Sequence, residues 1–250
     1  MKDKKLLVED YVKNITDESC KNFLHNPFMD NDNSELFKKW LDSYDNYEIT
    51  KDVYLVVPAF NEEKTVSQII EGIAERGYNV ILVNDGSRDK TLELAIDSKR
   101  KYPNQIFVVS HVINRGLGAA LKTGMVLAHN KGAKYIVTFD ADGQHEIADI
   151  PKVCKPLVDG EADVVIGARP FEDMPLSKSF ANYIMNALTF IFYGRNVKDS
   201  QSGLRAFTAH AADAINIVSR GYGVSSEFIK EISDKNLILE EVKKFLNNLK

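Results

Sequence analysis

Cysteine is scarce in this 250-residue chain, which has only two, Cys20 and Cys154. They lie far apart and form neither a CxxC pair nor a cysteine–histidine spacing typical of metal sites. This argues against a disulfide scaffold and against a structural zinc site. Because such sparse cysteine is typical of a reducing compartment, we expect a cytoplasmic protein.

Long apolar runs are also missing. No segment approaches the ~20 consecutive apolar residues that a membrane-spanning helix requires. The first residues, MKDKKLLVEDYVKN, lack the apolar core of a secretory signal. We therefore expect a soluble or peripheral protein.

An excess of basic residues is absent as well. The first 50 residues have 7 Lys and Arg against 11 Asp and Glu, and the rest of the chain has 25 of each. The formal charge of −4 therefore lies wholly in the first fifth of the sequence. We expect no nucleic-acid partner, because a nucleic-acid binder normally has a basic face.

Short β-branched runs alternate with helical spacing from residue 52 onward. The expected strands are Val53–Val57, Val80–Val83, Ile106–Val109, Tyr135–Phe139 and Val164–Ile166, and the helices that follow them span about 63–76, 89–101, 116–130, 146–158 and 179–193. This alternation predicts an α/β fold with a mostly parallel sheet and helices on both faces. Residues 1–50 read instead as an acidic extension with helices near 4–22 and 34–45, so we expect a second domain over 51–250.

The carboxyl ends of the expected strands have the polar groups. The segments there are PAFNEE, NDGSRD, NRGLG, DADGQH and GARP. Because ligands of open α/β sheets bind outside the carboxyl ends of the strands, we expect these segments to form one site. A merely solvated edge would also be polar, but this one is poor in lysine and rich in groups that hold metals and phosphates.

The glycines of NRGLGAALKTG (114–124) do not form a dinucleotide fingerprint. The third small position would be residue 121, which is Leu, and the segment follows the third strand instead of the first. A Walker A loop is also absent. Gly116 and Gly118 suit close approach to a phosphate, while helix–strand packing explains Gly118 and Gly124 equally well.

Asp140 and Asp142 follow the apolar run Tyr135–Phe139 directly. Two neighbouring carboxylates raise each other's pKa and cost free energy unless a positive charge lies between them. A turn would explain ADG alone. A divalent cation explains both carboxylates at the edge of a core, because such cations prefer oxygen ligands.

Four segments in this order resemble the family 2 inverting glycosyltransferases of GT-A fold: VVPAFNEEKTV, VNDGSRDKT, NRGLGAALKTGM and TFDADGQH. The later VIGARP and DSQSGLRAF resemble the branch that glycosylates polyprenyl phosphates, such as dolichol-phosphate mannose and glucose synthases. The resemblance covers about residues 52–232 and implies a GT-A fold and transfer of a sugar from a nucleotide-diphosphate sugar to a polyprenyl (dolichyl) phosphate.

The resemblance also implies roles for individual residues in binding the donor. Asp140 and Asp142 match the DxD pair that holds Mg²⁺ or Mn²⁺ against the donor diphosphate, and Gln144 matches a further oxygen ligand. The residues implied to line the nucleotide are Pro58, Ala59, Asn61, Glu62, Asp85, Gly116 and Asp140, with Glu62 near the ribose and Asp85 at the base edge. His145 is expected to support the site without binding the metal.

Arg169 and Arg205 resemble the arginines that bind phosphate in the polyprenyl branch, and the planar guanidinium suits bidentate phosphate contact. A phosphate acceptor is already ionised and needs little deprotonation, so a general base is optional. Glu227 matches the position of a base in relatives that act on hydroxyls, and we expect a supporting catalytic role for it beside Asp142. The mostly apolar segment 179–193 is expected either to lie on the cytoplasmic membrane face or to be a core helix.

Three other functions stay open at this point. A family 2 transferase acting on a saccharide hydroxyl would need a base such as Glu227. A sugar nucleotidyltransferase would have a glycine-rich basic loop at the first strand, where this chain has the acidic VVPAFNEE. A non-catalytic scaffold domain would not need the DAD pair and the two arginines.

Overall fold

The computed structural model describes residues 50–143, 145–168, 199, 201–219 and 223–243. The chain divides into two units, Met1–Asp45 and Asn46–Lys250, and all described residues belong to the second unit. The helices predicted near 4–22, 34–45 and 179–193 lie outside the described residues.

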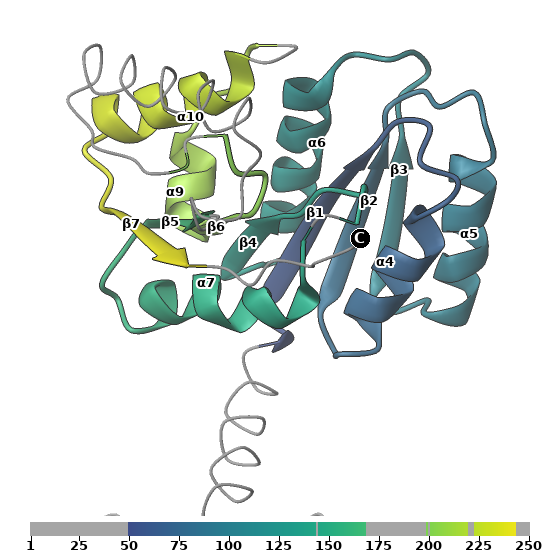
Figure 1. The fold of residues 1–250 in the computed structure, drawn as a ribbon, viewed down its shortest axis with the longest axis horizontal. Coiled ribbons are helices and arrows are strands. Elements are labelled where there is room, and N and C mark those ends of the chain that lie inside the picture. The colour runs from purple at the N-terminus through teal and green to yellow at the C-terminus, as the bar shows by residue number, and fades with distance from the viewer. Residues whose placement is uncertain (1–49, 144, 169–198, 200, 220–222, 244–250) are drawn as a thin grey trace, which may run out of the picture. The chain divides into compact units, whose positions relative to one another are not determined.

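The described strands form one seven-stranded sheet, in the order β3-β2-β1-β4-β6-β5-β7 (Figure 1). Their bounds are β1 Val53–Ala59, β2 Asn79–Asn84, β3 Ile106–Ser110, β4 Tyr135–Thr138, β5 Val164–Ala168, β6 Arg205–Thr208 and β7 Leu239–Lys243. Neighbouring strands pair in parallel except at β6, which is antiparallel to both β4 and β5. The predicted α/β architecture is thus confirmed, with one reversed strand that the sequence pattern did not predict.

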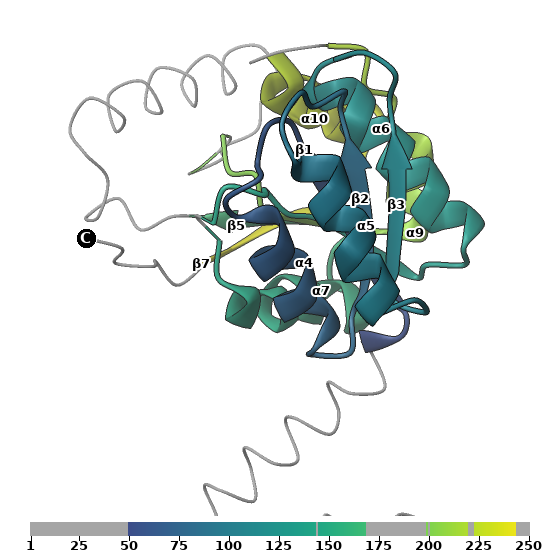
Figure 2. The same cartoon turned by 90° about the vertical axis from the view of Figure 1, so that its right-hand side faces the viewer.

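Helices cover both faces of the sheet (Figures 1 and 2). Their bounds are α4 Val66–Ala74, α5 Thr91–Lys101, α6 Leu117–Asn130, a 3-10 turn Ile147–Asp149, α7 Ile150–Val158, α9 Ala209–Ala214 and α10 Gly223–Asp234. Buried side chains of α4, α5 and α7 form one core with the sheet, and those of α6, α9 and α10 form the other. Strands with a helix layer on each face are buried on both sides, which explains their nearly continuous apolar runs.

Helix α4 illustrates how sequence spacing positions a helix. Its buried side chains Val66, Ile69, Ile70, Ile73 and Ala74 recur at the intervals of a single helix face. Burying each large aliphatic side chain contributes about 1.5–3 kcal/mol. The packing of α4 fixes its first turn beside the carboxyl end of β1, where the site lies.

Gly118 and Gly124 pack helix α6 closely against its neighbours. A Cβ at Gly124 would lie 2.2 Å from Val56 Cγ1 of β1, and one at Gly118 would lie 2.0 Å from the Ser219 carbonyl oxygen. Of the two explanations open for these glycines, the structure therefore supports helix packing. Among the described residues, no helix is both long enough and apolar enough to cross a bilayer.

Candidate active site

A cleft of about 420 Å³ opens at the carboxyl ends of β1, β2 and β4. This is where the strand order reverses, because β2 lies on one side of β1 and β4 lies on the other. The lining residues are Pro58, Ala59, Phe60, Glu62, Asp85, Asn114, Gly116, Leu117, Ala120, Asp140, Ala141 and Asp142. Seven of the residues that the sequence predicted for the donor site are among them: Pro58, Ala59, Glu62, Asp85, Gly116, Asp140 and Asp142.

Asp140 and Asp142 reach this cleft from the turn after β4. The Asp140 side chain is 37% exposed and its Oδ2 lies 2.9 Å from Nε2 of the buried His145. The ring of His145 packs edge-on against Phe139. Thr65, in the residues before α4, donates a hydrogen bond of 2.6 Å to the Ala141 carbonyl oxygen. The turn is therefore fixed from two sides, while the Asp142 side chain stays exposed.

Gly203 has its backbone directly against the Asp140 carboxylate. A Cβ at this position would lie 1.8 Å from Asp140 Oδ2, so every other residue type would displace the carboxylate. Thr138 Oγ1 donates to the Gly203 carbonyl oxygen at 2.8 Å and fixes the two segments together. The Asp140 carboxylate occupies the space where a side chain of residue 203 would lie, so this residue has to be glycine.

The carboxylates fit a divalent cation only together with a ligand that brings further oxygens. Asp140 and Asp142 are hard oxygen donors at an open cleft, the type that Mg²⁺ and Mn²⁺ prefer. Within the described ranges, no group of three or more His, Cys, Asp and Glu side chains is placed to hold a metal. Magnesium is commonly held by one or two carboxylates with substrate phosphates completing its shell, and this donor set matches that case. Gln144, the third predicted ligand, lies outside the described residues.

Asp85 is buried beneath the loop that carries Gly116. Its Oδ1 accepts from the Arg115 backbone amide at 2.9 Å, and its Oδ2 accepts from the Gly116 amide at 2.8 Å. The same Oδ1 lies 2.7 Å from His111 Nδ1, and His111 Nε2 lies 2.9 Å from Thr123 Oγ1. Gly116 itself has a φ of 88°, a left-handed conformation that favours glycine. In this structure Asp85 therefore orders one wall of the cleft, and its predicted contact with the base stays a prediction.

Asn61 lies beside the cleft but does not line it. Its backbone amide donates to Ser87 Oγ at 3.0 Å, and its side-chain Oδ1 accepts from the Arg88 amide at 2.9 Å. The neighbouring Glu62 amide donates to Thr91 Oγ1 at 2.8 Å. These contacts join the loop after β1 to the loop after β2. Asn61 thus supports the cleft from outside.

Arg205, the first residue of β6, is buried with 3% of its surface exposed. Its Nη2 donates to Ser225 Oγ of α10 at 2.8 Å, and its guanidinium lies 4.8 Å from the centre of the Phe228 ring. Burial lowers the pKa of Arg205 to about 10, against the opposing effect of Asp140 and Asp199, so the side chain is cationic at neutral pH. The predicted contact between Arg205 and an acceptor phosphate stays a prediction, and Arg169 lies outside the described residues.

Glu227 binds the backbone of the segment before α10. Its Oε1 accepts from the Val218 amide at 3.0 Å and its Oε2 from the Ser219 amide at 2.8 Å. Partial burial alone would raise the pKa of Glu227, but the hydrogen bonds from Ser219 and Val218 outweigh burial and lower it. A lowered pKa makes the carboxylate a weaker base, so the structure gives Glu227 a supporting role for this segment.

Several residues of the site were missed from the sequence. Phe60, Asn114 and Leu117 line the cleft, and each lies within a segment already recognised, so inspecting the neighbours of the predicted residues would have found them. Gly203 also lies within such a segment, DSQSGLRAF, whereas His111 lies in none. Their contacts with Asp85 and Asp140 join segments far apart in the chain, and only the fold brings them together.

Comparisons with known proteins agree with this geometry. The model of the family described as "Glycosyl transferase family 2" matches residues 54–213. An uncharacterized protein from Methanocaldococcus jannaschii is 44% identical over 78% of this chain and 82% of its own. The UDP-N-acetylglucosamine–dolichyl-phosphate N-acetylglucosaminyltransferase of Methanococcus voltae is 36% identical over 76% of this chain and 83% of its own.

A solved structure also shares the fold. Glucosyl-3-phosphoglycerate synthase from Mycobacterium tuberculosis, in complex with Mn²⁺, UDP-glucose and phosphoglyceric acid, matches with a TM-score of 0.60. The match covers 81% of this chain and 76% of that chain at 21% sequence identity. At this identity the likeness supports the GT-A-like fold alone.

Proposed function

This chain belongs to glycosyltransferase family 2, and we propose that it transfers a sugar from a nucleotide-diphosphate sugar to a polyprenyl (dolichyl) phosphate at the cytoplasmic face of a membrane. Membership of the family confirms the predicted fold and the predicted type of enzyme, a glycosyltransferase. It also argues against a sugar nucleotidyltransferase and against a scaffold without activity.

The observation that supports the proposal most directly is that seven of the predicted donor residues line one and the same cleft. The apolar wall of Pro58, Ala59 and Phe60 suits a flat base, and Glu62 suits a ribose hydroxyl. Gly116 has no side chain, so a phosphate can approach this loop closely, while the Gly116 amide itself donates to Asp85. A UDP-sugar and GDP-mannose are both compatible donors by this chemistry.

Asp140 and Asp142, with Gln144, would hold Mg²⁺ or Mn²⁺ at the diphosphate end of the cleft. When bound, such an ion neutralises charge that develops on the leaving diphosphate. The chain's own part is to fix the Asp140 carboxylate through His145, and the backbone of the turn between the two aspartates through Thr65, before the donor arrives. Groups held in place beforehand need little reorganisation during the reaction.

Two features favour a phosphate acceptor over a saccharide hydroxyl. Transfer to a hydroxyl needs a base, yet both carboxylate oxygens of Glu227 accept backbone hydrogen bonds and its pKa is lowered. A phosphate acceptor attacks as an anion, and the cations Arg169 and Arg205 suit its charge. The relative from Methanococcus voltae, named for transfer to dolichyl phosphate, supports the same choice.

The test is transfer of radiolabelled sugar from UDP-sugars and GDP-mannose, with Mn²⁺, to a short polyprenyl phosphate. We expect Arg169→Lys and Arg205→Lys each to lower transfer at least about ten-fold while donor binding survives, because lysine keeps the charge but loses the bidentate fork. Glu227→Gln is expected to retain most of the activity. If only Glu227→Gln loses transfer, the acceptor is a hydroxyl and the proposal is wrong.

A further inference from the structure

Exposed aliphatic side chains lie in the loop before helix α6, on α6 itself and on the segment opposite it. Val112 and Ile113, in the loop before α6, are 98% and 68% exposed. Val126 on α6 is 52% exposed, and Val218 is 72% exposed. Large aliphatic side chains are seldom left in water together without a binding role. We define the α6 surface as Val112, Ile113, Arg115, Lys122, Val126 and Val218.

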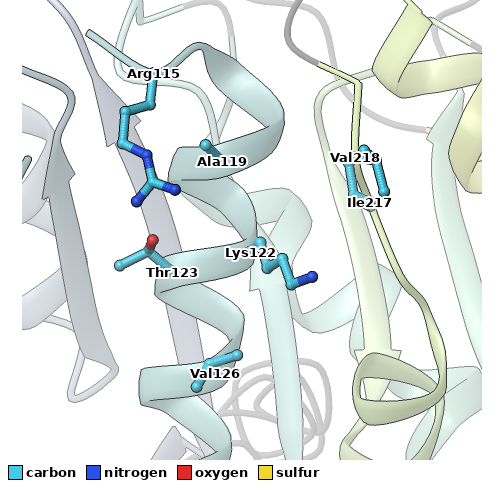
Figure 3. Close-up of a pocket in the computed structure, with 7 residues that line it drawn as sticks. All are labelled: Arg115, Ala119, Lys122, Thr123, Val126, Ile217 and Val218. Atoms are coloured by element: carbon cyan, nitrogen blue, oxygen red, sulfur yellow. The ribbon is translucent and has the colours of Figure 1, made fainter. Parts of the chain in front are cut away.

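A groove of about 510 Å³ runs through this surface (Figure 3). On one side, α6 contributes Ala119, Thr123 and Val126, together with the side chains of Arg115 and Lys122. On the other side lie Ile217 and Val218. A second pocket, of about 310 Å³, shares Lys122, Val126 and Ile217 and continues to His129 and the exposed Asp213. The groove therefore combines an apolar floor with two cations.

The charge of this part of the chain differs from that of the whole. Between Asp97 and Asp140 there is no Asp or Glu, whereas there are seven Lys and Arg, in a chain of net charge −4. Arg100, Lys101 and Lys134 are paired with Asp97, Glu71 and Asp52. Lys122 contacts the neutral Asn216, so its charge is not neutralised by that partner. The α6 surface thus combines exposed aliphatic side chains with the two cations Arg115 and Lys122.

We propose that the α6 surface docks on a lipid bilayer with anionic headgroups. Aliphatic side chains at a loop tip, flanked by Lys and Arg, are the combination that binds the interface of an anionic membrane. The inference rests on the proposed function, because a polyprenyl phosphate acceptor lies in a bilayer. Arg115 immediately precedes Gly116 of the donor cleft, so docking here holds the cleft at the membrane surface.

The experiment is flotation of the full chain with vesicles of equal parts phosphatidylcholine and phosphatidylglycerol, compared with phosphatidylcholine alone. We expect binding to the anionic vesicles that weakens in high salt. Val112→Asp combined with Ile113→Asp is expected to reduce binding about ten-fold or more, because the loop loses its apolar contact. Lys122→Ala is expected to reduce it about five-fold, the effect of one cation at an anionic surface.

Matched controls lie on α7, which covers the opposite face of the sheet. Val158 is 37% exposed, and Lys155 is exposed and paired with Asp159, so Val158→Asp and Lys155→Ala make single changes of the same kinds away from the α6 surface. Both are expected to bind vesicles as the unchanged chain does. Thermal unfolding and Mn²⁺-dependent donor binding of each variant show that loss of flotation is not loss of fold.

The results separate this inference from the proposed function. Unchanged flotation of the Val112→Asp, Ile113→Asp variant overturns the inference, as does failure of the unchanged chain to bind anionic vesicles. A change from dimer to monomer in sedimentation, without vesicle binding, would make the α6 surface a contact between two copies and would also overturn it. Flotation that follows the expected pattern, in a chain that transfers no sugar to any polyprenyl phosphate, supports the α6 surface and refutes the proposed acceptor.

Discussion

Asp140 is the residue through which distant parts of the chain meet at the cleft. His145 contacts its carboxylate, and the Gly203 backbone lies directly against it. Asp142 adds a second negative charge two positions later. Two carboxylates this close repel each other when no cation is bound. A cation bound together with the donor would relieve that repulsion.

Asp142→Asn is expected to lower Mn²⁺-dependent binding of the donor about ten-fold or more, because one of the two carboxylate ligands is lost. The fold should persist, and the midpoint of thermal unfolding should stay equal or rise, since repulsion between two carboxylates is relieved. Titration calorimetry with and without Mn²⁺ measures the effect. Equal donor affinity in the variant and the unchanged chain, with Mn²⁺ present, would refute the metal site.

Gly203→Ala adds a methyl group where the structure leaves 1.8 Å to Asp140 Oδ2. The carboxylate must move, and a shift of about 1 Å in a reacting geometry costs about a hundred-fold in rate. We expect sugar transfer to fall by ten- to hundred-fold, measured as kcat/KM.

Gly223→Ala is the control for this change. Its added Cβ would meet Ser219 Oγ at 3.4 Å, which is ordinary contact. We expect activity within about two-fold of the unchanged chain, since helix α10 begins here and alanine favours a helix. A similar loss in both variants would show that the fold, and not Asp140, is sensitive to the methyl group.

At the level of elements, α10 is joined to the segment before it by Glu227. Its two hydrogen bonds to the Val218 and Ser219 amides bridge the part of the chain that packs against Gly118 of α6. This segment also forms one side of the groove along α6. Glu227 thus connects the position of α10 to the shape of the α6 surface.

Glu227→Gln is expected to lower the free energy of unfolding by about 1–2 kcal/mol at neutral pH, because a carboxylate accepts stronger hydrogen bonds than an amide. The folded-state pKa of Glu227 is lowered, so its contribution is present above the unfolded pKa and is lost as pH falls through the folded pKa. Denaturant unfolding at neutral pH and at about pH 3.5 checks this. A difference between the two proteins that does not shrink in acid would contradict it.

Much of the sheet was predictable because each of the strands β1 to β5 is an apolar run followed by a helical pattern. The runs at Val53–Val57 and Val80–Val83 became β1 and β2 with only their ends extended. Strand β6 was missed because Arg205–Thr208 is four residues long and has no apolar run. Its reversed direction depends on pairing with β4 and β5, which no local pattern encodes.

The cleft was predictable where the binding groups follow strand ends, as Asp140, Asp142 and Glu62 do. It was not predictable where a residue contacts a segment that lies far away in the sequence. The carboxylate of Asp85 accepts hydrogen bonds from the amides of Arg115 and Gly116, contacts that the sequence did not predict, and its predicted contact with the base stays a prediction. These contacts depend on how two loops are placed relative to each other. The spacing of residues along one strand does not reveal that placement.

At the scale of the whole chain, the predicted division is an acidic extension over 1–50 and a catalytic domain over 51–250. The carbonyl oxygen of Asp52 accepts hydrogen bonds from Lys134 and Tyr135, and that of Lys51 accepts from the Asn79 side chain. Residues 51 and 52 thus already bond to the starts of the neighbouring strands β2 and β4. The division of the chain after Asp45 leaves these contacts intact.

A protein starting at Asn46 is expected to fold and to bind the donor with Mn²⁺ as the full chain does, because the described cores and the donor cleft lie after this residue. Its midpoint of thermal unfolding should lie within about 4 °C of that of the full chain, a shift that corresponds to at most about 1–2 kcal/mol at this size. Calorimetric unfolding measures it. A much lower midpoint or a non-cooperative transition would show that residues 1–45 are part of the catalytic fold.

The late position of strand β6 in the sequence also determines when the sheet can be completed as the chain is synthesised on the ribosome. Thr138 of β4 pairs with Arg205, 67 positions later, so the edge of β4 is unpaired until that stretch has been synthesised. Until then Asp140 lacks the backbone of Gly203 beside it. The first half of the sheet therefore emerges with an open edge, which is a site for misassociation between nascent chains. The Asp140 carboxylate therefore reaches the surroundings described above only after synthesis has passed β6.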